Sequence, residues 1–446
     1  MKRWFSDGLF RAVLRNSSYL GSAKVVGAPL GLLAMACAGR GLTPALFGLL
    51  IVIHTYATGA GALAKFQTWQ LIIRYGGPAL ERGDRSMAQD AIRFAFGLDI
   101  ASGLVGMVGA MALLPFLAGR LGLSGGTLAL ALIYCTLVPT MTTATPSGVL
   151  RLLDRFDLIG VQQLATPVLR GLGAGLSYVA HLGFPGFVAT WYIADLAGDL
   201  VTWAFAVREL RRRDMIDAFR PGLFGTARRL PDAWSFAWTT NIGHSVYSAW
   251  GPLSNLVVAG VLGPVAAGLY KIASTLLDST SKPADLLSRG FYPEIMRLDP
   301  ASVVPWRLGL RTGVVAGLIG LAMLLLVLVG GKPVIALVFG KKYLASFSLL
   351  SLMVWSLAIS MASFPLESLL YMVGRQRAAL VAQVAATTVY LALLALLTWH
   401  HGLIGAGQAY LLGTVAMAAF TLVPVIGSYR RRRETAASGA GAAVPA

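Results

Sequence analysis

Long apolar runs separated by short polar connections fill nearly the whole chain of 446 residues. An apolar run of about 20 residues is long enough to cross a bilayer as an α-helix. The pattern predicts two sets of six such spans. They are expected near residues 17–38, 45–74, 91–119, 126–150, 159–181, 184–207, 235–262, 264–296, 306–330, 344–371, 376–399 and 402–427. We therefore expect an all-α integral membrane protein with about twelve transmembrane helices.

The longest polar connection separates the two sets of spans, and the two halves share a short sequence pattern. "CAGRGLTPALFGLLIV" in the first half and "VAGVLGPVAAGLYKIA" in the second both carry Ala-Gly, then a proline, then Gly-Leu four residues after that proline. Internal repeats favour a transporter over an enzyme, because alternating access moves one repeat against the other. The expected parts are a six-helix lobe at 1–208, a linker at 209–234, a six-helix lobe at 235–429 and a basic tail at 430–446.

Charged residues make up only 13% of the chain, yet the net charge is +18. About 27 of the 37 lysines and arginines fall at the termini or in the even-numbered connections between spans. The positive-inside rule places those parts, including both termini, in the cytoplasm. Basic stretches such as "RELRRRD" would contact anionic membrane lipids there, and the amphipathic first 16 or so residues would lie in the interface. This placement excludes nucleic acid as the partner.

One expected span, residues 264–296, carries a polar stripe. Its members, at steps of three and four residues, are Lys271, Thr275, Asp278, Lys282, Asp285 and Arg289. That spacing keeps them within a sector of roughly 80° on a helix. Such a stripe should face a water-filled cavity or other protein, not lipid. Two interpretations stay open: internal salt bridges that hold a bundle together, or a hydrated substrate pathway.

Span two repeats the stripe with His54, Thr58, Gly61, Lys65 and Trp69, and span one adds Lys24. Lysine is a compact point charge that suits phosphate, so a lysine-lined cavity predicts an anionic, phosphate-bearing substrate. The candidate substrate-binding residues are Lys24, Lys65, Lys271, Lys282, Arg289 and His54. Each residue taken alone could instead form a buried pair or reach the interface.

Acidic residues inside the spans are candidates for ion coupling or gating. Asp195 and Asp199 lie one turn apart in an apolar span, where one of them could bind a proton or a sodium ion. A salt bridge from Asp195 or Asp199 to Arg170 is the alternative. The full set of coupling or gating candidates is Asp195, Asp199, Asp278, Asp285, Glu367 and Arg170.

The sequence contains no catalytic motif that would favour an enzyme over a transporter. The chain has no HExxH, P-loop or Gly-x-Ser-x-Gly sequence, and its two cysteines, Cys37 and Cys135, fall within expected spans. We therefore expect no metal site, no disulfide framework and no cofactor. Without an ATPase motif, transport would depend on an ion gradient, the membrane potential or consumption of the substrate downstream.

Four segments resemble a known family. They are "PALFGLL" and "FQTWQLIIRYG" in span two, "GVLRLLDRFDLIG" between spans four and five, and "GPVAAGLYKIAS" in span eight. They are similar to the polysaccharide-transporter branch of the multidrug/oligosaccharidyl-lipid/polysaccharide exporter superfamily, the Wzx-type oligosaccharide flippases. The resemblance covers the first two-thirds of the chain, and the last third matches in hydropathy and span count only.

The resemblance implies two six-helix lobes around a central cationic cavity in the bacterial inner membrane. The substrate would be an undecaprenyl-diphosphate-linked oligosaccharide, flipped by alternating access for surface polysaccharide assembly, such as exopolysaccharide or lipopolysaccharide. A polysaccharide polymerase and glycosyltransferases would be functional partners. The four intramembrane lysines match the cavity residues in kind, although the family often uses arginine. A drug/cation antiporter of the same fold, a lipid II flippase and a polyprenyl-phosphate membrane enzyme remain alternatives.

Overall fold

The computed structural model describes residues 8–282, 291–292, 294–300 and 302–441. The chain forms two compact units, Met1–Leu256 and Val257–Ala446. Within the described ranges the secondary structure is helical, with no strand. The expected linker at 209–234 lies within the first unit, and the proposed lobe boundaries stay a prediction.

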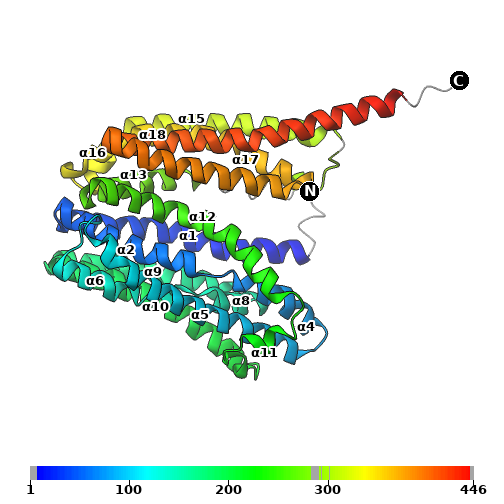
Figure 1. Cartoon of the computed structure of the whole chain (residues 1–446), viewed down its shortest axis with the longest axis horizontal. Helices are drawn as coiled ribbons and strands as arrows, with labels where there is room; N and C mark the ends of the chain where they lie inside the picture. The colour runs from blue at the N-terminus through cyan, green and yellow to red at the C-terminus, as the bar shows by residue number, and fades with distance from the viewer. Residues whose placement is uncertain (1–7, 283–290, 293, 301, 442–446) are drawn as a thin grey trace. The chain divides into compact units, whose positions relative to one another are not determined.

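The first unit is built mainly from α1, α2, α5, α9 and α10, with short helices between them. The elements are α1 (Gly8–Gly41), α2 (Pro44–Ala64), α3 (Thr68–Leu71), η1 (Ile72–Gly76), α4 (Gly77–Glu81), α5 (Arg85–Ala118), α6 (Gly125–Cys135), α7 (Val138–Met141), α8 (Ala144–Leu152), α9 (Phe156–Val179), α10 (Gly183–Arg211), η2 (Ile216–Phe219), α11 (Phe224–Ala227) and α12 (Ala233–Leu262), which continues into the second unit. Helix α1 packs along α9, and α9 packs along α10 (Figure 1).

In the first unit, two of the expected spans are broken rather than continuous. The segment 45–74 divides into α2, an extended turn at 65–67, α3 and the π-helical turn η1. The segment 126–150 divides into α6, α7 and α8. Helices α3 and α8 pack together, as do α2 and α7, so the two breaks lie in adjoining parts of the unit. Irregular backbone at membrane depth is tolerated only where it is buried in protein or lines a cavity.

The second unit is built from long helices that pack side by side. Its further elements are α13 (Pro264–Thr280), α15 (Val304–Val338), η3 (Lys341–Tyr343), α16 (Ala345–Met353), α17 (Trp355–Met372) and α18 (Gln376–Gly441). Helix α18 is two helices joined at Gly402, whose φ of 61° suits glycine. Helix α15 packs along α17, and α17 along α18. The α15–α17 contact is close, since a Cβ added at Gly320 would lie 2.8 Å from the Cα of Ala358.

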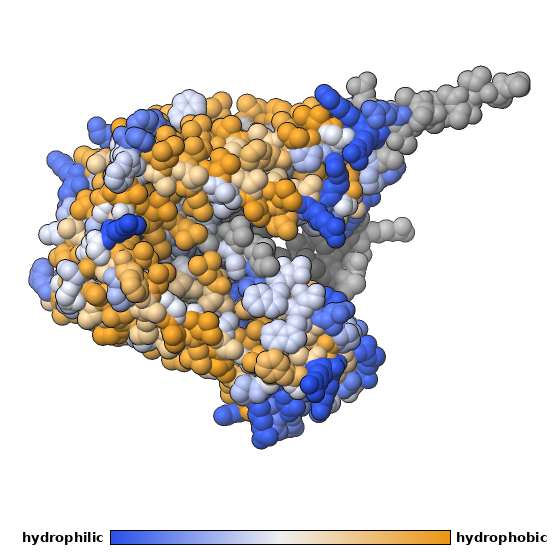
Figure 2. Space-filling view, viewed as in Figure 1, coloured by the Kyte–Doolittle hydropathy of each residue, from blue (hydrophilic) through white to orange (hydrophobic). Residues whose placement is uncertain are grey.

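The helices meet the requirements of a membrane protein. Six described stretches are long and apolar enough to span a bilayer, and two shorter apolar helices accompany them. Each of the twelve expected segments lies mainly on helix, apart from the breaks described above, and the eighth is followed continuously only to Lys282. Apolar side chains cover the middle of the helices and hydrophilic ones gather towards the ends (Figure 2). On α15, Leu310, Leu318 and Val329 are 71%, 61% and 80% exposed, as side chains facing lipid would be.

Candidate functional site

A small cavity lies where span two breaks. It has a volume of about 270 Å³ and is lined by Thr58, Gly61, Ala62, Lys65, Met141 and Ser248. These residues come from α2, α7 and α12, all in the first unit. Lys65 caps the C-terminal end of α2 with extended backbone, and its amide donates to the Gly61 carbonyl at 2.9 Å. The structure therefore places a half-buried lysine at a cavity inside an apolar bundle.

The helical spacing that grouped Lys65 with Trp69 ends at this break. Beyond it, the Phe66 ring packs edge-on against Trp238 at 5.1 Å between centroids. The Trp69 indole donates to the side-chain oxygen of Gln67 at 2.8 Å. Trp69 therefore belongs to α3 rather than to α2, and the helical part of the stripe ends at the C-cap residue Lys65.

Two carboxylates interact electrostatically with Lys65. Asp99, on α5, is fully buried, and Asp199, on α10, is partly buried. Asp99 accepts hydrogen bonds from the Thr68 hydroxyl at 3.0 Å and the Thr145 amide at 2.8 Å. Asp199 accepts one from the Thr140 hydroxyl at 3.2 Å. The lysine thus has negative charge near it, on side chains that are themselves fixed by neighbouring hydroxyl and amide groups.

A second buried cluster surrounds Asp195. Its carboxylate forms an ion pair with Arg170 and accepts a hydrogen bond from the Tyr134 hydroxyl at 2.8 Å. The His54 Nδ1 lies 3.4 Å from the carboxylate and 3.1 Å from the Tyr134 oxygen. The Arg170 guanidinium also stacks over Trp191, 5.6 Å from the ring centroid. Asp195 therefore has the salt-bridge partner that the sequence offered as the alternative to ion binding.

The remaining expected site residues are half-buried, exposed or outside the described part of the structure. Lys271 is half-buried on α13, whereas Asp278 and Lys282 are exposed. Glu367, on α17, is exposed and accepts a hydrogen bond from the Tyr371 hydroxyl at 2.6 Å. Asp285, Arg289 and the side chain of Lys24 lie outside the described part of the structure. A shared cavity for the lysines of spans two and eight stays a prediction.

Asp99 and Tyr134 were missed by the sequence reasoning. Asp99 had a usable signal, since it is an acidic residue inside the apolar segment 91–119. Tyr134 had no such signal in the sequence, because tyrosine is common in apolar segments. Only the structure shows that its hydroxyl donates to a carboxylate.

The resemblance motif "GVLRLLDRFDLIG" forms a charged corner between α8 and α9. Arg155 contacts Asp157 at 2.9 Å and the buried Glu209 of α10 at 2.5 Å. Hydrogen bonds from Arg155 hold the pKa of Asp157 below its ordinary value. Glu209 also pairs with Arg212 at 3.2 Å. The motif therefore fixes the end of α10 against the start of α9.

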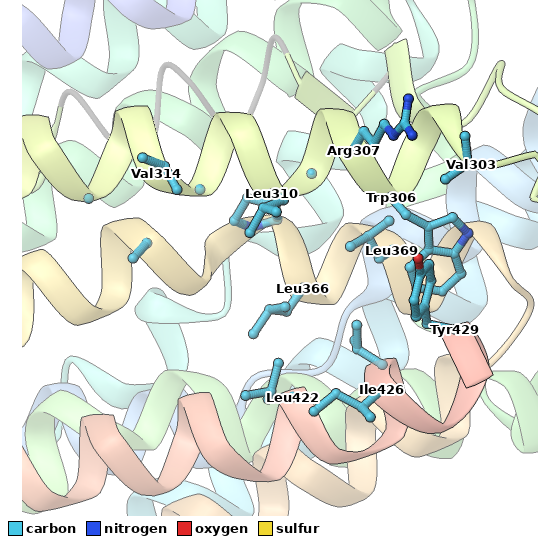
Figure 3. Close-up of a pocket in the computed structure, with 16 residues that line it drawn as sticks. Val303, Trp306, Arg307, Leu310, Val314, Leu366, Leu369, Leu422, Ile426 and Tyr429 are labelled. Carbon is cyan, nitrogen blue, oxygen red and sulfur yellow. The ribbon is translucent and has the colours of Figure 1, made fainter. Parts of the chain in front are cut away.

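The second unit has an apolar pocket of about 580 Å³ between α15, α17 and α18. At one end the Trp306 and Tyr429 rings lie side by side, 5.3 Å between centroids, while Arg307 projects away from them (Figure 3). Leu366 and Leu422 point into the space between α17 and α18 (Figure 3). Such a lining suits hydrocarbon rather than a charged group. Among the described residues, no group of three or more His, Cys, Asp or Glu side chains could hold a metal ion.

Broken spanning helices with buried charges at the breaks are features of a membrane transporter rather than an enzyme. A model of the family described as "Polysaccharide biosynthesis protein" matches residues 13–282, and the chain belongs to this family. It is also 51% identical over 350 residues to "Inner membrane protein YghQ" of Escherichia coli (strain K12), covering 78% of this chain and 99% of the relative.

Similar solved structures show the same fold. One is titled "Inward-facing conformation of a multidrug resistance MATE family transporter of the MOP superfamily"; its TM-score is 0.68 at 14% identity, covering 91% of this chain and 95% of that one. Another, "Lipid II flippase MurJ, inward closed conformation", has a TM-score of 0.68 at 13% identity, covering 93% and 89%. The expected all-α, multi-pass transporter fold and its superfamily branch are confirmed.

Proposed function

We propose that this protein flips an undecaprenyl-diphosphate-linked oligosaccharide across the bacterial inner membrane by alternating access, for surface polysaccharide assembly. The observation that carries the proposal is Lys65, a half-buried lysine at a cavity where a spanning helix breaks. The family, whose description is polysaccharide biosynthesis, supports the substrate class. The lysine supplies the positive charge that a diphosphate group requires.

The neighbours of Lys65 give the site a means of release. Without substrate, Asp99 and Asp199 attract the ammonium electrostatically, and neither forms a direct ion pair with it among the described residues. An arriving diphosphate competes with these carboxylates for the same charge, so the net gain on binding is smaller than for an isolated lysine. A transporter needs such moderate binding, because a substrate held too tightly is not released on the other side.

The site also indicates which carboxylate would couple transport to an ion. Asp195 is already bound to Arg170, Tyr134 and His54, so its charge is compensated within the fold. Asp199 has the hydroxyl of Thr140 and the electrostatic interaction with Lys65. We assign the coupling role to Asp199, whose protonation would release Lys65 to the substrate.

The alternatives fit this site less well. A drug/cation antiporter would need a carboxylate in contact with its substrate, whereas Lys65 is the titratable residue that lines this cavity and neither Asp99 nor Asp199 is among its lining residues. Flipping of lipid II remains a second candidate, because lipid II also carries a diphosphate and the MurJ structure shares the fold.

Restoration of surface polysaccharide in a strain that lacks the gene tests the proposal. Loss of one charge-assisted contact to phosphate costs about 1.5–3 kcal/mol, so Lys65→Gln should reduce export roughly tenfold or more. Lys332→Gln, at an exposed position on α15, is the matched control and should export normally. Expression level and melting temperature are recorded for each variant. Normal export by a well-folded Lys65→Gln variant would contradict the proposal.

A further inference from the structure

A second polar cavity lies at the ends of the helices of the first unit. Its volume is about 590 Å³, and it is lined by Leu80, Gly83, Arg85, Leu153, Arg212, Arg213, Asp214 and Met215. Three connections contribute to it: the one between α4 and α5, the one between α8 and α9, and the one that follows α10. It shares no lining residue with the Lys65 cavity.

The two arginines that follow α10 are held in place by the fold. Arg212 donates to the Glu209 carboxylate at 3.2 Å, and Glu209 is itself buried and paired with Arg155 at 2.5 Å. Arg213 reaches across to the backbone carbonyl of Leu153 at 3.5 Å. Arg212 is therefore held by its own helix and Arg213 by the α8–α9 connection, and both residues line the cavity.

The third arginine, Arg85, lies where the connection between α4 and α5 ends. Arg85 is the first residue of α5, directly after Asp84, whose carboxylate caps the helix by accepting from the Met87 amide at 3.0 Å. The turn before it passes through Gly83 at a φ of 77°, a conformation that favours glycine. This turn brings Arg85 to the same cavity as the arginines after α10.

The lining has the charge and shape of an anion site. Three arginines and one aspartate, Asp214, line the cavity, and the buried Glu209 pairs with both Arg212 and Arg155. The guanidinium groups therefore outnumber the carboxylates there. Leu80, Leu153 and Met215 give the cavity an apolar part beside its charged part. The planar guanidinium fork matches phosphate oxygens in pairs, and arginine is favoured wherever phosphate is bound in this way.

We propose that this cavity binds a phosphate-bearing anion through Arg85, Arg212 and Arg213, at a site separate from the transport cavity. The bound group ties the start of α5 to the end of α10 and to the α8–α9 corner. Because it binds the folded unit, it stabilises that unit in proportion to its concentration. The phosphate belongs either to a phospholipid headgroup beside the protein or to a soluble diphosphate.

Two probes distinguish these sources in the purified full-length protein. Inorganic pyrophosphate is titrated by calorimetry in detergent, and phosphatidylglycerol retention is measured by native mass spectrometry against phosphatidylcholine. Loss of a charge-assisted contact predicts roughly tenfold weaker binding for Arg85→Gln and for Arg213→Gln. Arg228→Gln, an exposed arginine outside the cavity, should bind as the unmodified protein does.

Each outcome has one meaning. Pyrophosphate binding that is weakened by Arg85→Gln but not by Arg228→Gln supports a soluble ligand. Selective loss of phosphatidylglycerol in the same variant supports a lipid headgroup. Equal behaviour of Arg85→Gln and Arg228→Gln with both probes overturns the proposal. If Arg213→Gln fails to fold, Arg85→Gln decides alone, because no described side chain forms an ion pair with Arg85.

The measurements are repeated in Lys65→Gln to separate this site from the transport cavity. A pyrophosphate signal that disappears with Lys65 belongs to the transport cavity and contradicts the proposal. A signal that persists in Lys65→Gln and is lost with Arg85→Gln belongs to the arginine cavity. The proposed anion site can thus be rejected while the proposed flippase function stands, and the flippase function can be rejected while the anion site stands.

Discussion

At the scale of single residues, the decisive feature is how the buried charges are partnered. Asp195 and Asp199 stand one turn apart on α10 but belong to different clusters, one with Arg170 and one with Lys65. A buried carboxylate with an arginine partner is held by the structure, because removal of either charge leaves the other uncompensated in a low-dielectric environment. The same reasoning predicts different consequences for substitutions at the two aspartates.

Asp195→Asn should destabilise the protein strongly. The side chains of Asp195 and Arg170 are only 10% and 20% exposed, so the variant leaves Arg170 buried without its counter-charge. The expected loss in the free energy of unfolding is about 3 kcal/mol. Thermal unfolding in detergent measures it. The double variant Asp195→Asn, Arg170→Gln should recover part of the loss, and Asp154→Asn, at an exposed position, should change little.

An Asp195→Asn protein as stable as the unmodified one would show that the Arg170 pair does not hold the fold. Export should follow stability in these variants, because Asp195 is assigned a structural role.

Asp199→Asn should fold normally, since among the described residues no arginine lies within 4.0 Å of the Asp199 carboxylate. Its transport should lose its dependence on the ion gradient, because Asp199 is assigned the coupling role.

At the scale of elements, glycine positions decide how closely helices approach. A Cβ at Gly320 of α15 would meet not only the Cα of Ala358 but also the Leu357 carbonyl oxygen, at 3.1 Å. These are backbone atoms of α17, so the helices must separate to admit a methyl group. Gly330, on the same helix, has no atom within 4 Å of the position where a Cβ would stand.

Gly320→Ala should therefore destabilise the second unit by about 1–3 kcal/mol. Gly330→Ala is the matched control and should leave the unfolding transition where it was. Thermal unfolding of both variants, prepared in the same detergent, measures the difference. Equal melting temperatures for the two variants would contradict the close approach of α15 and α17 at Gly320.

At the scale of the whole molecule, the charge distribution predicts the orientation in the membrane. Both termini and the connection 209–234 carry basic clusters, whereas the opposite connections hold few basic residues, Lys341 and Lys342 among them. Translocation of basic loops is disfavoured, so the basic side should be cytoplasmic. The arginine cavity, built by connections on that basic side, would then face the cytoplasm.

Thiol labelling of intact cells checks this orientation. After Cys37 and Cys135 are replaced by alanine, a membrane-impermeant reagent should label Lys341→Cys but not Arg220→Cys or Arg228→Cys. Labelling of the two linker positions after the cells are opened shows that those cysteines are reactive. Protection of Lys341→Cys together with labelling of Arg220→Cys in intact cells would reverse the assignment.

The sequence by itself determined the class of protein and the position of the helices. In the part of the chain that the structure describes, the expected apolar segments lie mainly on helix, because a spanning helix satisfies its own backbone hydrogen bonds and needs only a local run of apolar residues. It also named Lys65, Asp195, Asp199 and Arg170 as candidate site residues, because a charge inside a span is costly wherever it occurs, and their roles in transport stay a prediction.

Only the tertiary structure decided how those charges are partnered and where the helices break. His54 and Asp195 meet across two helices that are far apart in the chain, and Asp99 gathers Thr68 and Thr145 from two others. Helical periodicity places side chains on a face but carries no information about which face of another helix it meets. The break after Ala64 likewise depends on contacts with distant residues such as Trp238, since a helix end inside the bilayer persists only when surrounding protein satisfies its backbone.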